Sequence, residues 1–377
     1  MRIFTLQSVN FDIDDFLSNY WQKRPVVLRQ ALSDFSDFLD EHDLAGLSED
    51  DEVDSRIIQN TDGNWHVTQG PFEDFAPLCK GKWTLLVQGV DKYLDEASEL
   101  MRTFSFIPHW RMDDLMVSFA NAGAGVGPHL DQYDVFLLQG KGQRHWKVGE
   151  PGEHETHYPH PLLSQIDGFE PVIDTVLQPG DVLYIPPGWP HDGVAVNDCL
   201  TYSIGFRAPD QSQLFDILPD MFEESGTGNI RFSDPTRTRA ADPSSVSPED
   251  LRQLKLLIKN ALDTDACDTA LLRFLSNQYL PEQVPETLIS RSDVKNALEN
   301  GIDIVPSPGC RPVYTSESDN FTFYVNGEAF TCDEKYKAMM LANFTGRPLP
   351  PSLTSRADCT IFDLLATLIN KGYWAME

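Results

Sequence analysis

A histidine and an aspartate separated by one residue are the pair in this chain with the clearest chemical potential. His129 and Asp131 lie in GPHLDQYD, and on a strand two such residues point to the same face. An imidazole beside a carboxylate supplies two ligands of a 2-His-1-carboxylate site, which holds Fe(II) and leaves positions open for oxygen and a chelating cosubstrate. The third ligand must then be a histidine from a distant strand. We predict His191, because in GDVLYIPPGWPHDG a strand over 182–185 and the turn Pro186-Pro187-Gly188 deliver it to that strand's end.

Two more polar residues fit a cosubstrate that carries a carboxylate. Arg144 follows a glycine-marked turn and provides a fixed cation that can bind a dicarboxylate through two parallel hydrogen bonds. Ser118, on a neighbouring predicted strand, is placed to donate to the same carboxylate. On its own, His129 would be interpreted as a core or turn histidine bonded to Asp131. The additional residues favour the iron site over that structural interpretation.

Short predicted strands must hold these side chains in place. Up to residue 208, one helix around residues 16–21, ended by Pro25, precedes apolar stretches separated by Gly- and Pro-marked turns. Many short strands between such turns are typical of a sandwich or barrel, and a double-sheet jelly roll of the cupin type fits the pattern. The predicted strands are 83–87, 115–119, 135–139, 145–148, 181–185 and 200–206.

Helices dominate the next predicted segment, 209–281. Apolar residues with helical spacing lie within 214–222 and 270–280, and a third helix begins at Pro248 behind the cap Ser247. Apolar stripes on helices without a sheet of their own are buried either in a homodimer interface or against the preceding domain. The residues leave both arrangements open.

The last predicted domain, 282–377, has the pattern of a winged helix. Strands over 321–325 and 328–332 flank Asn326-Gly327, the strongest short-range hairpin signal. Helices are predicted before this hairpin, at 293–298, and after it, at 335–343 and 360–371. A basic winged helix would suggest DNA binding, but here a contact with protein or a structural role is predicted. The reason is the set of acids around the hairpin: Glu317, Asp319, Glu328, Asp333 and Glu334.

Composition and charge exclude several classes of protein. The 377 residues are 41% hydrophobic, which suits two or three folded domains and excludes a disordered chain. With 58 acidic and 29 basic residues the formal charge is −29, so direct nucleic-acid binding and anionic membranes are disfavoured and a basic partner is favoured. The six cysteines form no CxxC pair, and no signal peptide or membrane-spanning run is evident. We expect a cytoplasmic protein with no membrane attachment.

Several segments together resemble the JmjC family of Fe(II)- and 2-oxoglutarate-dependent oxygenases. The similarity is greatest to the bacterial ribosomal oxygenases, which hydroxylate an arginine of a large-subunit ribosomal protein. It covers the first domain almost fully and extends more loosely to KGYWAME at the end of the chain. The segments that carry the resemblance are FLSNYWQKRPVVLRQAL, EVDSRIIQNTDGNWHVTQGPF, WTLLVQGV, DDLMVSFANAGAGVGPHLDQYDVFLLQGKGQRHW, GDVLYIPPGWPHDG and YSIGFRAP.

The resemblance implies a fold, cofactors and site residues. It implies a double-stranded β-helix (jelly roll) at 1–208, a helical dimerisation segment at 209–281 and a winged-helix-like domain at 282–377. The implied ligands of Fe(II) are His129, Asp131 and His191. The residues implied to bind the cosubstrate 2-oxoglutarate are Ser118, Arg144 and Thr201.

The resulting hypothesis is a homodimeric dioxygenase that uses Fe(II), 2-oxoglutarate and O2 to hydroxylate an arginyl β-carbon of a basic large-subunit ribosomal protein. Two alternatives stay open. The same iron chemistry could act on a histidyl, asparaginyl or methyl-lysyl residue, or the chain could be a non-catalytic cupin-like module that docks a basic protein. His154, His157 and His160 recur every third residue, but the prolines among them forbid a regular helix, and we expect exposed loop histidines rather than a second metal site.

Overall fold

The computed structural model divides the chain into two compact units. The first unit comprises Met1–Ala208, Gln278–Arg311 and Lys335–Glu377, and the second comprises Pro209–Asn277 and Pro312–Glu334. The structure describes residues 4, 6, 11–32, 34–226, 228, 230–239, 242–282, 285–315, 320–356 and 359–377.

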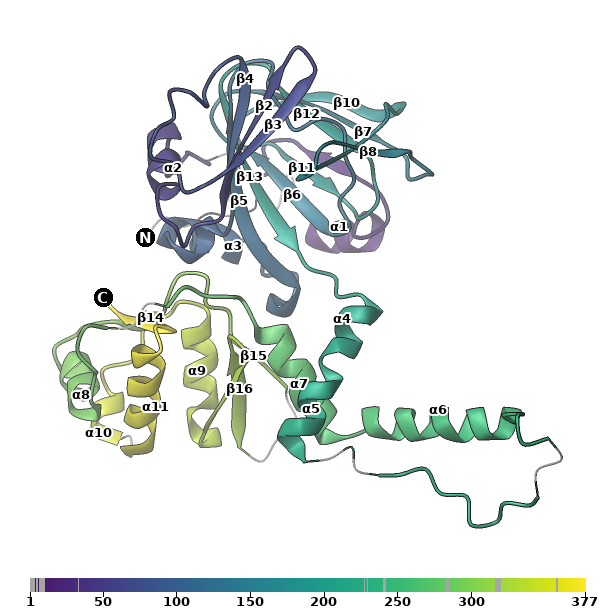
Figure 1. Cartoon of the computed structure of the whole chain (residues 1–377). Coiled ribbons are helices and arrows are strands. Elements are labelled where there is room, and N and C mark those ends of the chain that lie inside the picture. The colour runs from purple at the N-terminus through teal and green to yellow at the C-terminus, as the bar shows by residue number, and fades with distance from the viewer. Residues whose placement is uncertain are drawn as a thin grey trace. The chain divides into compact units, whose positions relative to one another are not determined.

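Two antiparallel sheets form the body of the first unit (Figure 1). The larger has the order β1-β11-β6-β13-β5-β4-β2-β3 and the smaller the order β10-β7-β12, while β8 and β9 pair separately. The two sheets share an apolar core in which side chains of β6 and β11 meet those of β7 and β10. This arrangement is the predicted double-sheet jelly roll. The strands are β1 (Val26–Leu28), β2 (Ser55–Thr61), β3 (Asn64–Gln69), β4 (Lys82–Val87), β5 (Met112–Ala120), β6 (Asp134–Gln139), β7 (Arg144–Gly149), β8 (Thr156–His160), β9 (Leu163–Ile166), β10 (Pro171–Leu177), β11 (Val182–Ile185), β12 (His191–Ala195) and β13 (Cys199–Phe206).

Strand alternation explains how the larger sheet supports two apolar layers. On β6, Val135 and Leu137 point to the core between the sheets, whereas Phe136 packs on the other face against Phe16 and Tyr184, with ring centroids 5.3 and 4.9 Å away. That outer face is covered by helices near the N-terminus. They are α1 (Ile13–Asn19), α2 (Glu41–Leu47), η1 (Val90–Lys92), α3 (Asp95–Arg102) and η2 (His109–Arg111).

The rest of the first unit comes from the C-terminal part of the chain. Its helix α11 packs on α8, and its strands β14 and β18 pair antiparallel. Trp374 of β18 is 1% exposed and its indole N–H donates to Asn343, which is also buried. The elements are α8 (Arg291–Glu299), β14 (Ile304–Pro306), α9 (Lys337–Phe344), α10 (Leu353–Arg356), α11 (Cys359–Asn370) and β18 (Trp374–Met376), with η3 (Glu334–Tyr336) just before α9.

The second unit contains four helices and a small sheet among its described residues. The predicted hairpin is confirmed: Asn326 and Gly327, with φ of 47° and 83°, form the two-residue turn between β16 and β17. The helix predicted behind Ser247 is also confirmed, with Ser247 and Asp250 forming a capping box. Of the acids predicted around the hairpin, Glu317 and Asp319 lie outside the described residues. The elements are α4 (Gln211–Asp216), α5 (Leu218–Ser225), α6 (Pro248–Leu262), α7 (Asp265–Ser276), β15 (Val313–Tyr314), β16 (Phe321–Val325) and β17 (Glu328–Cys332).

Two predicted helices in this unit differ from the observed ones. The helix predicted within 214–222 is split at Ile217 into α4 and α5, because Pro219 stands at the first turn of a new helix rather than in the interior of one. The helix predicted over 270–280 begins earlier, at Asp265 behind the cap Thr264, and ends at Ser276. In the described part of the chain, no helix is both long and apolar enough to cross a bilayer.

Candidate functional site

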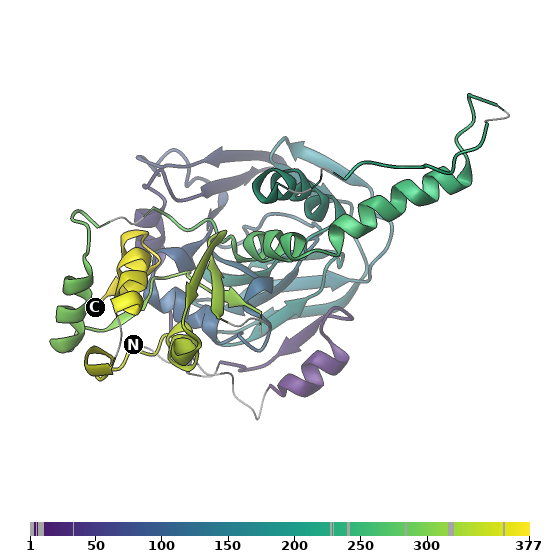
Figure 2. The same ribbon diagram turned by 90° about the horizontal axis from the view of Figure 1, so that it is seen from below.

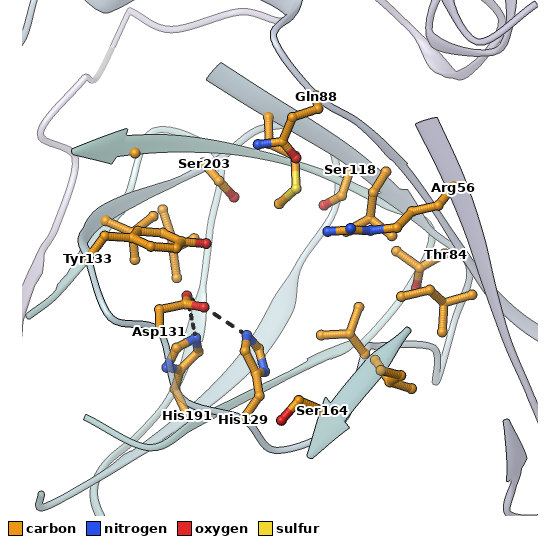
Figure 3. A pocket seen from close by; sticks show the side chains of 18 of the residues that line it. Arg56, Thr84, Gln88, Ser118, His129, Asp131, Tyr133, Ser164, His191 and Ser203 are labelled. Carbon is orange, nitrogen blue, oxygen red and sulfur yellow. Dashed lines mark ion pairs between the residues drawn. The ribbon is translucent and has the colours of Figure 1, made fainter. Parts of the chain in front are cut away.

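The three predicted ligands converge at one point of the jelly roll. His129 and His191 form an isolated antiparallel bridge in which each backbone N–H donates to the other's carbonyl at 3.0 Å. Asp131 Oδ2 lies 3.4 Å from His191 Nε2 and 4.0 Å from His129 Nε2, and one ligand atom from each residue lies within 4.8 Å of the others (Figure 3). Among the described residues this is the one group of three such side chains with that spacing. The donor set is the one that a facial Fe(II) site needs.

Backbone carbonyls fix both imidazoles for metal binding. The Nδ1 of His129 lies 2.9 Å from the carbonyl oxygen of Gly127, and the Nδ1 of His191 lies 2.9 Å from that of Trp189. A carbonyl can only accept, so in both rings Nδ1 carries the proton and the lone pair of Nε2 faces Asp131. Such outer partners orient metal-binding histidines and set their tautomer.

The charges at the cluster also favour a metal ion. Burial, and then the neighbouring His191, lower the pKa of His129 to about 4, so this ring is neutral near pH 7. Burial opposes ionisation of Asp131, but the neighbouring His191 and His129 hold its pKa below the ordinary value. A hydroxyl hydrogen bond from Tyr133 contributes to that lowering. A neutral imidazole at His129 beside an ionised Asp131 gives protonation states that metal binding requires.

The glycine-rich loop before His129 lies against β12. A Cβ on Gly125 would stand 2.4 Å from the carbonyl oxygen of Gly193, and one on Gly127 would stand 2.2 Å from Gln165 Nε2. Gly127 also has φ of +81°, which an L side chain rarely adopts. The loop can therefore pass this close to Gly193 and Gln165 only with glycine at both positions.

A cavity of about 570 Å³ opens beside the triad, between the sheets. Figure 3 shows the triad on one side of it and Arg56, Ser118 and Gln88 on the opposite side. Arg144 also lines the cavity. Arg56, which points into the cavity from β2, was not predicted from the sequence. Arg56 and Ile58 face the cavity, whereas Ile57 between them packs in the apolar core on the other face of the sheet.

Arg144 fits a buried anionic ligand. The residue is 5% exposed, and neither its Nε nor its Nη2 has a hydrogen-bond partner. An unpaired buried guanidinium is costly, so it indicates a place for an anion. Ser118 lines the same cavity, and its cross-strand partner Thr201 is buried with its own hydroxyl unpartnered. The three residues thus offer the donors that a carboxylate needs, although Thr201 itself does not line the cavity.

Acidic residues line another part of the cavity: Asp54, Asp113 and Asp114. Asp114 is 8% exposed and accepts a hydrogen bond from the Gly89 N–H at 2.9 Å. Burial, followed by the charges of Asp91 and Asp113, raises the pKa of Asp114 to about 7. A buried carboxylate that lines a cavity is suited to receive a cationic group.

Three polar or aromatic residues near the triad in sequence, Tyr133, Asp134 and Trp189, have different positions. Tyr133 lines the cavity. Trp189 packs partly buried against the core between the sheets. Asp134 is fully buried outside the cavity lining, where it accepts hydrogen bonds from Tyr184, Gln22 and Arg111, so its role is structural.

The recurring histidines lie on and beside the β8–β9 hairpin, not in a metal cluster. His157 is exposed, with its Nδ1 3.9 Å from Asp167 Oδ1, and His160 is the last residue of β8. With His154 they are absent from the group of three metal-binding side chains found in the described ranges.

Comparisons with known proteins agree on both parts of the chain. Residues 99–214 match the family model of a JmjC domain, and residues 257–375 match that of a ROXA-like winged helix. The chain is 38% identical over 366 residues to the ribosomal protein uL16 3-hydroxylase of Escherichia coli, covering 96% of this chain and 97% of that protein. It is 33% identical over 344 residues to a probable ribosomal oxygenase of Haemophilus influenzae, covering 86% and 84%.

Solved structures extend this similarity to the fold. The E. coli ribosomal oxygenase YcfD in complex with cobalt and 2-oxoglutarate is 36% identical, with a TM-score of 0.88 over 99% of each chain. A structure of the same protein in complex with cobalt and succinic acid has a TM-score of 0.87 over 99% of each chain.

Proposed function

The chain belongs to the JmjC-domain family that includes the ribosomal protein uL16 3-hydroxylase, and from this premise we propose that it hydroxylates an arginyl side chain of a large-subunit ribosomal protein, using Fe(II), 2-oxoglutarate and O2. The observation that carries the proposal is a His–Asp–His cluster beside a buried arginine with unpartnered nitrogens in one cavity. The first group suits Fe(II) and the second suits the far carboxylate of 2-oxoglutarate.

Each residue has a distinct part in this reaction. His129, Asp131 and His191 would hold Fe(II), and Arg144 with Ser118 and Thr201 would bind 2-oxoglutarate. When bound, the iron supplies oxidative decarboxylation of 2-oxoglutarate to succinate and CO2, with one oxygen atom of O2 placed in succinate and the other in a C–H bond of the substrate. The protein orients the substrate carbon and keeps water away.

The cavity acids support a cationic substrate side chain. A guanidinium beside Asp114 would make charge-assisted hydrogen bonds and remove the cost of an unpaired buried carboxylate. A basic ribosomal protein would also be attracted to a chain of charge −29. Such a substrate would place the enzyme in the cytoplasm. We keep the division into a catalytic domain (1–208), a dimerisation segment (209–281) and a winged-helix-like domain (282–377) as part of this proposal.

The direct test is intact-mass measurement of large-subunit ribosomal proteins that lack the modification. With Fe(II), air and the purified protein, one of them should gain the mass of one oxygen atom when 2-oxoglutarate is present, and fragmentation should place it on an arginine. Oxygen on a histidine or asparagine, or loss of a methyl group from a lysine, would support the alternative substrates. Absence of both a mass change and succinate, with iron bound, would support the non-catalytic binding module.

The pKa of Asp114 leads to a prediction about pH. Because a guanidinium binds the ionised carboxylate and the pKa is about 7 in the free protein, the KM for the protein substrate should fall as pH rises from about 6 to about 8. In Asp114→Asn this dependence should disappear, and KM should rise about 10-fold or more, as expected for a lost hydrogen bond between charged groups. The measurement is initial hydroxylation rate against substrate concentration at each pH.

The matched control for this prediction is Asp174→Asn. Asp174 is on the outer face of β10, paired with His145, and does not line the cavity. An unchanged pH dependence in Asp114→Asn would show that another group is responsible for it.

Helix α6 supports the proposed homodimer. None of its residues is buried, and Leu251, Leu254 and Ile258 are 49%, 42% and 57% exposed along one stripe. Figure 2 shows α6 extending away from the other helices of its unit. A second copy of the same helix would cover this stripe.

Changing Leu254 and Ile258 to glutamate should therefore convert a dimer into a monomer in sedimentation velocity, because two charges cannot be buried in an apolar interface. The control is Gln253→Glu with Asn260→Glu, which adds the same charge on the opposite side of α6. A wild-type protein that is monomeric at micromolar concentration would refute the dimer.

A further inference from the structure

A buried ion pair joins the C-terminal part of the first unit to η1, beside the strand that carries two of the cavity acids. Arg311 Nη1 lies 2.7 Å from Asp91 Oδ2, and the two side chains are 6% and 0% exposed. Asp91 belongs to η1, whereas Arg311 follows β14 and lies within the residues that match the winged-helix model. Nothing in the proposed reaction uses this pair.

The ion pair contacts β5 on both sides of Asp114. Arg311 Nη2 donates to the carbonyl oxygen of Asp113 at 2.5 Å, and Asp91 Oδ1 accepts from the N–H of Leu115 at 2.8 Å. The residue between these two contacts is Asp114, whose carboxyl group lines the cavity. On one edge of β5, where pairing with β4 ends at Val117, side chains thus bond the backbone that flanks Asp114, while the other edge pairs with β13.

The sheet explains why such side-chain contacts are needed. On the partner strand β13, Ile204 pairs with Leu115 and Phe206 pairs with Met112, so the register shifts between them and two residues of β5 oppose one of β13. This is the pattern of a β-bulge, in which the ladder is interrupted and local backbone groups lose their regular partners. On the other edge of β5 the pairing with β4 ends at Val117. Arg311 and Asp91 therefore bond the free edge beside this bulge, where Asp113 and Asp114 lie.

The backbone around Arg311 is itself anchored, both to Gln278 and to the segment 92–98. The N–H of Arg311 donates to the side chain of Gln278, whose Nε2 donates back to the Arg311 carbonyl. Gly309, with φ of +73°, passes so close to η1 that a Cβ would lie 3.0 Å from the Cα of Lys92, and its N–H lies 3.3 Å from Ser98 Oγ. Arg311 therefore projects from a well-anchored segment.

We propose that Arg311 is a positioning residue for substrate binding: through Asp91 and the carbonyl of Asp113, it holds the bulge of β5 so that Asp114 faces the substrate cation. The inference rests on the proposed function in one respect, namely that Asp114 receives that cation. Through Arg311, the C-terminal part of the chain would fix the position of a residue that lines the catalytic cavity. Arg311 itself would contact neither iron nor 2-oxoglutarate.

The test compares Arg311→Met and Arg311→Lys with the wild-type full-length chain. We expect the KM for the protein substrate to rise about 10-fold in Arg311→Met and less in Arg311→Lys, which keeps the charge but cannot bond to Asp91 and Asp113 together. The KM for 2-oxoglutarate and the succinate formed without protein substrate should change less than about twofold, within the range of indirect coupling. Hydrogen exchange of the segment 112–118 should become faster in both variants.

Controls separate this role from a general loss of stability. Arg291→Met removes an exposed ion pair with Asp363 in the same part of the chain and should leave every parameter unchanged. If Arg311→Met fails to fold, Arg311→Met combined with Asp91→Asn removes both charges and keeps an acceptor for the Leu115 N–H. An equal loss in all kinetic parameters, or an unchanged KM for the protein substrate, would overturn the proposal.

If the proposed function itself were wrong, the experiments would give a different result from the one that overturns the role of Arg311. In that case the wild-type protein would modify no arginyl substrate, whereas exchange of 112–118 in the variants would still report whether Arg311 holds the bulge. Unchanged exchange there would overturn the positioning role whatever the substrate.

Discussion

Replacing His129 with alanine should lower the rate of succinate formation by more than about 100-fold, because even the loss of an outer partner of a metal ligand costs about 10- to 100-fold. The change removes one of only three protein donors at the cluster and leaves Asp131 and His191. Folding should be little affected, because His129 is neutral and its side chain makes one hydrogen bond, to Gly127. The measurements are succinate formation at saturating Fe(II) and 2-oxoglutarate, and thermal unfolding without metal.

The matched control is His145→Ala. His145 lies on β7 but faces away from the cavity, paired with the exposed Asp174. Its removal should leave turnover within about twofold of wild type, as for most surface substitutions. If His129→Ala kept turnover within tenfold of wild type, the assignment of iron to this cluster would be wrong.

The parts of the fold that were predicted from sequence are those with a strong local pattern. The six predicted strands of the first domain correspond to β4, β5, β6, β7, β11 and β13 to within three residues at either end, because apolar runs between Gly and Pro turns define them. The hairpin at Asn326-Gly327 has the predicted bounds for the same reason. Strands β2, β3, β8, β9, β10 and β12 were not predicted, because polar and apolar residues mix in them and pairing with neighbours decides their structure.

The site residues that were predicted from the sequence are those of characteristic type that lie close together along the chain. His129 and Asp131 share a strand-like segment, and the turn before His191 is marked by proline and glycine. Asp114 was missed because the strand was predicted to begin at Leu115, whereas β5 begins at Met112 and includes Asp113 and Asp114 at a bulge. Arg311 was missed for a stronger reason: only tertiary folding brings it to Asp91, and no local pattern encodes that contact.

The second large effect is expected on 2-oxoglutarate binding when Arg144, whose Nε and Nη2 have no hydrogen-bond partner, is replaced. In Arg144→Met, the KM for 2-oxoglutarate should rise about 100-fold, because two hydrogen bonds between charged groups are worth about 1.5–3 kcal/mol each and part of that is lost to water-mediated contacts. The maximal rate should fall less. The measurement is succinate formation against 2-oxoglutarate concentration, with Lys147→Met as control, since Lys147 lies on the same strand but outside the cavity lining.

Although Arg144→Met should bind 2-oxoglutarate more weakly, it should not be less stable than the wild type in thermal unfolding. Without ligand, the wild type holds a cation that is 5% exposed, with two nitrogens unpartnered and only the ring of Trp146 at 5.8 Å as partial compensation. Methionine removes that cost, so Arg144→Met should be at least as stable as wild type. With Mn(II) present, 2-oxoglutarate should raise the Tm of the wild type but barely that of the variant, because a ligand stabilises only the state that binds it. An equal rise in both proteins would mean that Arg144 does not bind the cosubstrate, and that its buried charge serves another anion in the same cavity.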